Sequence, residues 1–463
     1  MSLSRQFAAF THGLTCDALP DPVKDRAKGV LLQALCSALL AHDMPATRQA
    51  LAIMADEDPP GPATTLGHGA KLSKAGAAFV NAEMILAGGK WDTFRMLTHP
   101  GTAIIPAALV TGELTHAHGS TLLTAIAAAY EVMERMAAEF IPTVMSRGFH
   151  AGPTFGIFGA AIAAAKTQGL SADQINGAIA QCVNLASGNL EGIRSGGRSL
   201  REGGAVRNAL LAVALARHGT PGGETTLEGE AGFYHSYAGN NRGQLRYSFT
   251  GRNDTNLADI TKNLGQDWIF LETLYRIYST AGYNIAHVDV TAAIMRENNL
   301  DPADIDWIEA VVNWFETEYP SPAFPLPGED GAARAGATQY FSAWGAAMGS
   351  YPLARGGGPT ADSPDPPAVL ALMKRVRIIP MVRQTLFGPR VTIALKDGRQ
   401  FTKQATGREF IWDFETHARR MREIVPALRI TPAAFDQLVE TCRTLDTVPD
   451  AARRLIDLTI PSG

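Results

Sequence analysis

NAEMILAGGKWDTFRMLTHPG, residues 81–101, indicates how the chain is built, because it joins two helical segments through a loop rich in ionisable and aromatic side chains. A small-residue helical run is expected to end at Gly88 and Gly89, since glycine commonly closes a helix. Pro100 disfavours a helical conformation at the residue before it, and a new apolar helix is expected from about Thr102. Such loops between rigid helices often carry functional sites, although a single one is more often a solvated surface loop.

A second loop of the same kind, Arg-Gly-Phe-His at residues 147–150, precedes another Gly/Ala-rich helix and favours the functional interpretation of both loops. Ser171 and Gln174 form a capping box, and Asp21 is expected to cap a helix that starts with Pro22. Helices rich in small residues pack closely and are buried. Helices are expected at residues 21–40, 71–87, 102–117, 119–138, 154–168, 172–187 and 203–218, and several of them are unusually rich in Ala and Gly.

The character of the sequence changes near residue 266. Segments rich in β-branched and aromatic residues predict strands at 306–314, 374–379, 390–395 and 400–403, and helices return at 413–425, 431–445 and 449–457. The predicted fold class is therefore mainly α: a large all-helical domain with an inserted smaller α+β lid domain. Its parts are a helical domain at residues 1–265, a lid domain at 266–404, and C-terminal helices at 405–463 that rejoin the helical domain.

Composition excludes several classes of protein. The 463 residues carry a net charge of −4 and no Lys/Arg-rich run, so no nucleic-acid partner is expected. No uncharged apolar run is long enough for a membrane span, and no signal pattern opens the chain, so no membrane association or secretion is expected. Four scattered cysteines without a Cys-x-x-Cys pair fit a reducing, cytoplasmic location.

Common cofactor and metal motifs do not occur. Residues 88–90, Gly-Gly-Lys, are not a phosphate loop, because Met84 occupies the position of the required glycine and Trp91 that of the magnesium-binding Ser or Thr. His116 and His118 would face different sides of a helix, so they predict no metal pair. We expect neither a metal nor a cofactor.

Arginines surround glycine pairs just before a predicted helix start, at Arg194, Arg198, Arg201 and Arg207. Guanidinium groups and free backbone N–H groups at a helix N-terminus bind carboxylates well. The alternative is a solvated basic loop paired with Glu191 and Glu202.

The order of these motifs resembles the MmgE/PrpD family, which includes 2-methylcitrate dehydratase, cis-aconitate decarboxylase and iminodisuccinate epimerase. The resemblance covers nearly the whole chain. It rests on Asn81 and on residues 98–101, 130–132 with Arg135, 148–150, 158–161, 227–229 and 232–233. It implies a large helical domain with an α+β lid, and a homodimer.

The resemblance also implies site residues. Family lyases carry His-x-x-Asp-x-Asp-Asp-Thr in the first loop; the histidine falls at Leu86 and the first, catalytically implicated aspartate at Gly89. Matches to the family are retained at Asp92, Thr93, His99 and His150. Two lysines expected to hold substrate carboxylates fall at Arg198 and Arg276, and a lid tyrosine falls at Trp344. Arginine keeps the positive charge but cannot supply a proton near neutral pH.

The predicted function is a cofactor-independent lyase that abstracts a proton α to a carboxylate of a small di- or tricarboxylate. His99 and His150 would act as general acid and base, with Asp92 or Lys90 supplying or orienting the second proton carrier. Substrate would be bound by Thr93, Arg198, Arg201, Arg276 and Trp344. Two alternatives stay open: an epimerase or isomerase of a dicarboxylate such as an iminodisuccinate-like substrate, and a non-catalytic carboxylate-binding paralogue.

Overall fold

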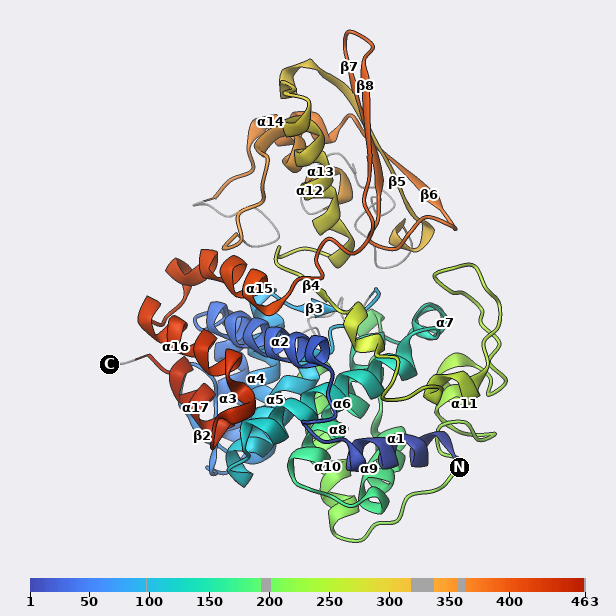
Figure 1. Ribbon diagram of the computed structural model, residues 1–463, viewed down its shortest axis with the longest axis vertical. Helices are drawn as coiled ribbons and strands as arrows, with labels where there is room; N and C mark the ends of the chain where they lie inside the picture. The colour runs from blue at the N-terminus through green and yellow to red at the C-terminus, as the bar shows by residue number, and fades with distance from the viewer. Residues whose placement is uncertain (97, 193–200, 318–336, 356–362, 462–463) are drawn as a thin grey trace. The chain divides into compact units, whose positions relative to one another are not determined.

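The fold is mainly α, as predicted: helices make up 57% of the chain and the sheets are small. The computed structural model describes residues 1–96, 98–192, 201–317, 337–355 and 363–461. Contacts divide the chain into two compact units (Figure 1). The helical unit comprises Met1–Ser248, Arg252–Tyr275 and Trp412–Gly463, and the smaller unit comprises Phe249–Gly251 and Arg276–Ile411. A role for the smaller unit as a lid stays a prediction.

The helical unit is built around α8 (Ala151–Thr167), in which every residue except Lys166 is buried. It packs against α5, α6, α9 and α10, and small residues permit the close approach: a Cβ at Gly159 would lie 2.8 Å from Ile104 Cγ1 of α5. The other helices of this part are α1 (Leu3–Gly13), α2 (Asp21–Leu40), α3 (Pro45–Glu57), α4 (Lys74–Gly88), α5 (Gly101–Thr115), α6 (Gly119–Ala137), α7 (Ile141–Ser146), α9 (Ala172–Leu185), α10 (Arg201–Arg217) and α11 (Phe233–Ala238).

Local signals explain several helix ends. The capping box of Ser171 and Gln174 is present at α9, and Gly89 ends α4 in the left-handed conformation with φ 73°. The prediction that Asp21 caps α2 is wrong: the cap position is Pro20, and Asp21 lies inside the first turn, where its charge still favours the helix N-terminus. The first loop is less irregular than expected, because a two-residue strand within it pairs with a distant segment.

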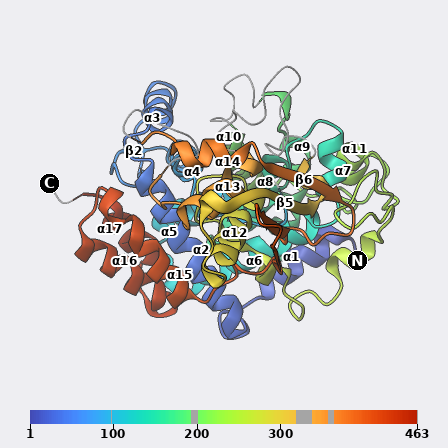
Figure 2. The same ribbon diagram turned by 90° about the horizontal axis from the view of Figure 1, so that it is seen from above.

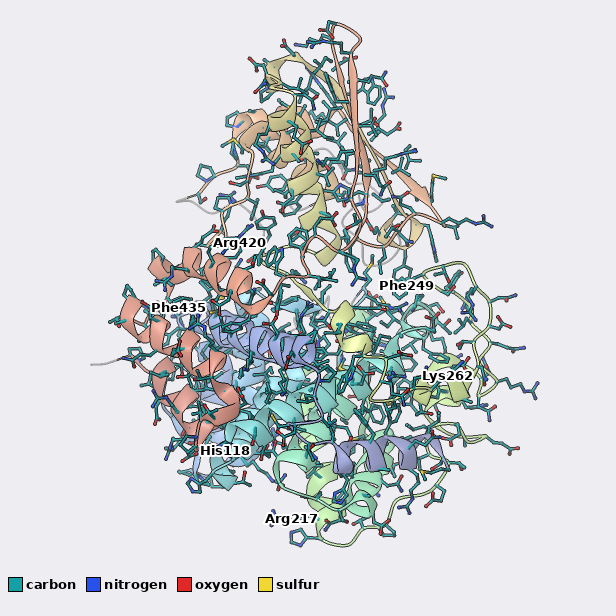
Figure 3. All side chains as sticks on the ribbon, viewed as in Figure 1. His118, Arg217, Phe249, Lys262, Arg420 and Phe435 are labelled. Carbon is teal, nitrogen blue, oxygen red and sulfur yellow. The ribbon has the colours of Figure 1, made fainter. Side chains whose placement is uncertain are left out.

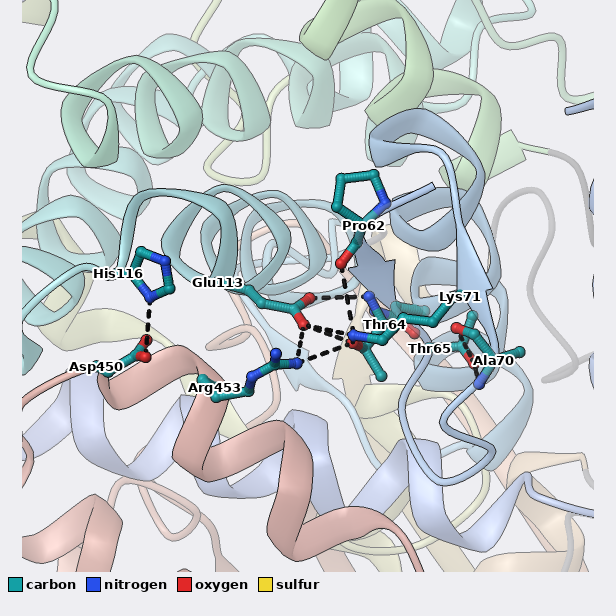
Figure 4. Close-up of polar contacts among 10 residues, drawn as sticks. Pro62, Thr64, Thr65, Ala70, Lys71, Glu113, His116, Asp450 and Arg453 are labelled. Atoms are coloured by element: carbon teal, nitrogen blue, oxygen red, sulfur yellow. Dashed lines mark hydrogen bonds and ion pairs between the residues drawn. The ribbon is translucent and has the colours of Figure 1, made fainter. Parts of the chain in front are cut away.

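The C-terminal helices pack against the N-terminal part of the chain (Figures 1 and 2). These helices are α15 (Phe414–Met421), α16 (Pro432–Arg443) and α17 (Ala451–Thr459); α15 and α16 contact α2, and α17 contacts α5. Phe435 of α16, labelled in Figure 3, is completely buried. Glu113 of α5, which is 4% exposed, accepts from Arg453 Nη1 of α17 at 2.7 Å and from the Thr64 backbone N–H at 2.8 Å (Figure 4).

The smaller unit contains a four-stranded sheet in the order β6-β5-β7-β8, with β5 parallel to β6 and the other pairs antiparallel. Its strands are β5 (Ile305–Asn313), β6 (Val376–Met381), β7 (Arg390–Leu395) and β8 (Gln400–Gln404). The helices are α12 (Gly282–Glu297), α13 (Thr338–Met348) and α14 (Pro367–Met373); α12 contacts β7 and β8, and α13 contacts β6. All four strands overlap the predicted segments, whereas the sequence analysis did not identify α13 and α14.

Within the described part of the chain, no single helix is both long enough and apolar enough to cross a membrane. The pair α2 and α3, bent by 90° at the break between them, meets those criteria only when taken together.

Candidate active site

The first loop fixes the orientation of His99. Asp92 and Thr93 form β3 (Asp92–Thr93), which pairs with β4 (Leu274–Tyr275). His99 Nδ1 lies 3.1 Å from the Asp92 carbonyl oxygen and 3.0 Å from Thr93 Oγ1. A carbonyl oxygen can only accept, so Nδ1 carries the proton and Nε2 is the basic nitrogen of the neutral ring. This tautomer suits a general base.

The Asp92 carboxylate is occupied by internal contacts. It is 3% exposed and accepts from the Gly101 backbone N–H at 3.1 and 3.0 Å and from the Tyr130 hydroxyl. Burial raises the pKa of Asp92 to about 6, although the hydrogen bonds from Tyr130 and Gly101 oppose the shift. Asp92 therefore binds residues on both sides of Pro100: its carbonyl contacts His99, and its carboxylate accepts from the first residue of α5. Its predicted role in supplying or orienting the second proton carrier stays a prediction.

Lys90 and Trp91 form the buried beginning of this loop. The Lys90 side chain is almost fully buried, at 1% exposure, and its backbone N–H donates to Ser37 Oγ at 3.1 Å. The Trp91 ring lies 4.5 Å from the His99 ring, and its indole N–H donates to the Leu86 carbonyl at 2.9 Å. Trp91 thus packs against His99 and limits where the imidazole can lie.

The second loop places His150 at the N-cap of α8, where it meets a residue of α10. Its Nδ1 accepts from the Gly152 backbone N–H at 3.0 Å, and its Nε2 lies 3.0 Å from Arg201 Nη1. His150 is 3% exposed. The structure therefore brings two of the predicted site residues, 51 positions apart, into direct contact.

Two buried carboxylates near Arg201 were not proposed as site residues from the sequence. Glu202 is 1% exposed, and its Oε1 lies 3.2 Å from Arg201 Nε; Glu83 is also 1% exposed and accepts from the Gly203 N–H at 3.0 Å. Burial raises the pKa of Glu202, opposed chiefly by Arg201, and raises the pKa of Glu83 to about 8. The alternative prediction placed Glu202 in a solvated loop, paired with arginines. It is wrong for Glu202, which is buried at the start of α10, where that helix packs against α4, α5 and α8.

Thr102 links the two loops. Its hydroxyl donates to the His99 carbonyl at 2.6 Å and also lies within hydrogen-bonding reach of Glu202. A path of polar groups therefore runs from the backbone carbonyl of His99 through the side chains of Thr102, Glu202 and Arg201 to the imidazole of His150. We call these five residues the histidine cluster; it lies at the adjoining N-termini of α5, α8 and α10.

Of the other predicted substrate-binding residues, Thr93 contacts His99 through its hydroxyl. Arg198 falls outside the described residues. Arg276 and Trp344 belong to the smaller unit, where they are 6% and 4% exposed. The Trp344 indole N–H donates to the Ser350 carbonyl at 2.7 Å, and the Arg355 guanidinium lies 5.0 Å from its ring. Their roles in substrate binding stay predictions.

Comparison with known proteins identifies the family of the chain. The MmgE/PrpD N-terminal domain matches residues 5–245, just over half of the chain, so the chain belongs to the MmgE/PrpD family. It is 29% identical over 244 residues to cis-aconitate decarboxylase of Homo sapiens, covering 51% of this chain and 50% of that protein. It is 24% identical over 290 residues to cis-aconitate decarboxylase of Aspergillus terreus, covering 60% and 57%. It is 25% identical over 276 residues to a cis-aconitate decarboxylase-like protein, oryM, of Aspergillus oryzae, covering 57% and 55%. Each match therefore spans only about half to three-fifths of the relative's length.

Proposed function

We propose that the protein is a cofactor-independent lyase of a small di- or tricarboxylate, whose reaction involves proton transfer at the carbon α to a carboxylate. The observation that carries the proposal is the convergence of the two histidine loops on one buried cluster. The Asp92 carbonyl fixes the tautomer of His99, and Arg201 Nη1 contacts His150 Nε2 within the cluster. The relatives named cis-aconitate decarboxylase support a carboxylate substrate.

In the dehydratase-like form of the reaction, His99 Nε2 removes the α-proton. The carbon–hydrogen electron pair forms the double bond as the β-hydroxyl leaves with a proton from the second histidine. Arg201 holds a substrate carboxylate, and that contact draws it away from His150 Nε2. Arg198 and Arg276 supply further cations, and Thr93 and Trp344 complete the substrate site. We also propose a homodimer, as the family resemblance implies.

A second candidate is an epimerase of a dicarboxylate, and Gly89 favours it. The family's lyases carry an aspartate at this position, whereas here a glycine with φ 73° closes α4. After α-proton removal by one histidine, reprotonation by the other on the opposite face inverts the carbon without loss of a leaving group.

Proton NMR in deuterated water separates these functions. The full-length protein is incubated singly with cis-aconitate, 2-methylcitrate, citrate and aspartate derivatives, and deuterium uptake and products are followed together. The lyase proposal expects a product formed by loss of water or carbon dioxide. Deuterium exchange or inversion without such loss would favour the epimerase. Thermal stabilisation by these acids without exchange or product would favour a carboxylate-binding paralogue.

A further inference from the structure

Glu202 and Arg201 form an ion pair that abuts the imidazole of His150. The guanidinium contacts both partners, with Nη1 at 3.0 Å from His150 Nε2 and Nε at 3.2 Å from Glu202 Oε1. The carboxylate also lies close to the first turn of α8. A Cβ built on Gly152 would be 2.7 Å from Glu202 Oε1 and 3.0 Å from His150 Nδ1. The side chains of Glu202 and His150 therefore pack against the same glycine.

The contacts of His150 create a conflict that this ion pair can control. Both of its ring nitrogens face N–H donors, those of Gly152 and Arg201, but a neutral imidazole accepts at one nitrogen only. The Gly152 amide lies in the first turn of α8, where no helical carbonyl is available to it. Arg201 has Glu202 as a second partner, so the position of its guanidinium decides which contact His150 keeps.

Charges near the Arg201–Glu202 ion pair come from several packed elements. Arg201 and Glu202 come from α10, Glu83 from α4, and Asp92 from the loop before α5. Arg201 disfavours the imidazolium form of His150, and an ionised Glu202 offsets that effect. Glu83 instead accepts from the Gly203 amide, and its described contacts do not include His150.

We propose that Glu202 is a positioning residue for His150: its carboxylate holds and neutralises Arg201, and thereby sets the protonation of the imidazole. This inference rests on the proposed role of His150 in proton transfer. Glu202, which the sequence analysis did not include among the site residues, would then act in proton transfer by controlling His150. A purely structural Glu202 would only fill the space between the N-termini of α5 and α8.

The test follows the ring signals of His150 by NMR in full-length protein with isotope-labelled histidine, assigned with a His150→Gln variant. Glu202→Gln leaves the Arg201 charge uncompensated, so the titration midpoint of His150 is expected to fall by about one pH unit. Arg201→Gln leaves the negative charge of Glu202 uncompensated instead, so the titration midpoint of His150 is expected to rise. The double variant should titrate near the wild type, and Glu202→Asp should preserve the wild-type midpoint because it keeps the charge.

Glu83→Gln is the matched control, because it removes an equally buried carboxylate and should leave the His150 titration unchanged. A folded Glu202→Gln protein with the wild-type midpoint would overturn the proposal, as would shifts of the same sign in the two single variants. If Glu202→Gln does not fold, Arg201→Gln with an unchanged midpoint overturns it instead. These measurements need no substrate, so their outcome is independent of whether the protein catalyses deuterium exchange.

Discussion

At the residue scale, the two histidines have opposite surroundings. The Nδ1 of His99 faces oxygen acceptors from Asp92 and Thr93, whereas both nitrogens of His150 face N–H donors. Acceptors stabilise the N–H of the ring, and donors stabilise its lone pair. His99 thus has a fixed tautomer with Nε2 as the base, and the state of His150 depends on Arg201. Under the proposed function, this difference gives distinct proton-transfer roles to two residues that look equivalent in the sequence.

Glu83 makes stability depend on pH. Its pKa is about 8 in the folded protein against an ordinary value of 4.5, so the folded state binds the proton more tightly than the unfolded state. Ionisation therefore costs stability progressively as pH rises from about 4.5 to about 8. Glu83→Gln should keep the bond from the Gly203 N–H without this cost. In thermal unfolding, the Tm of the variant should increase relative to that of the wild type as pH rises across that range. A difference in Tm that does not change with pH would contradict the raised pKa of Glu83.

At the element scale, the sequence located helices and strands well where the signal was local. The capping box at Ser171 and the glycine stop at Gly89 are examples, because each involves residues within one helical turn. Two features were missed because they depend on contacts between distant parts of the chain. The pairing of Asp92 with Tyr275 joins segments far apart in the chain, and an acid beside Arg201 at a helix start resembles a surface ion pair. Burial of Glu202 follows only from the packing of α10.

Gly89→Ala should destabilise the protein by about 1 kcal/mol, because an L-residue is strained in the left-handed conformation that closes α4. Gly204→Ala is the control. Gly204 lies inside α10, and a Cβ there would meet nothing within 4 Å, so alanine should stabilise by ~0.5–1 kcal/mol. Urea unfolding of both variants measures the difference. Equal effects at the two glycines would show that backbone conformation does not explain Gly89.

At the scale of the whole molecule, the helical unit is closed by both ends of the chain. Met1–Ser248, Arg252–Tyr275 and Trp412–Gly463 share one set of contacts, and nearly all of the smaller unit is formed by Arg276–Ile411. Glu113 is the polar centre of this closure, since Arg453 of α17 and Thr64 both bind its carboxylate (Figure 4). The sequence predicted α5 and α17 separately, but the partners of Glu113 become evident only in the folded unit.

Glu113→Ala should lower the free energy of unfolding by about 2 kcal/mol, because it leaves the buried Thr64 amide without an acceptor. The loss of the Arg453 contact adds less, because that side chain is 41% exposed. Asp397→Asn, at an exposed ion pair with Arg399 in the β7–β8 turn, should change stability little. Chemical denaturation of the two variants provides the comparison. A small effect of Glu113→Ala would mean that α17 is held to α5 by apolar packing alone.

The central claim is that His99 and His150 transfer protons at the α-carbon of a carboxylate substrate. The most direct measurement is the rate of deuterium incorporation from deuterated water into whichever panel acid the wild type exchanges, repeated with His99→Gln and His150→Gln. Each variant should lose roughly two to four orders of magnitude in rate while retaining the wild-type fold. Exchange at the wild-type rate in either folded variant would contradict the account. So would a wild type that neither exchanges any acid of the panel nor converts it with loss of water or carbon dioxide.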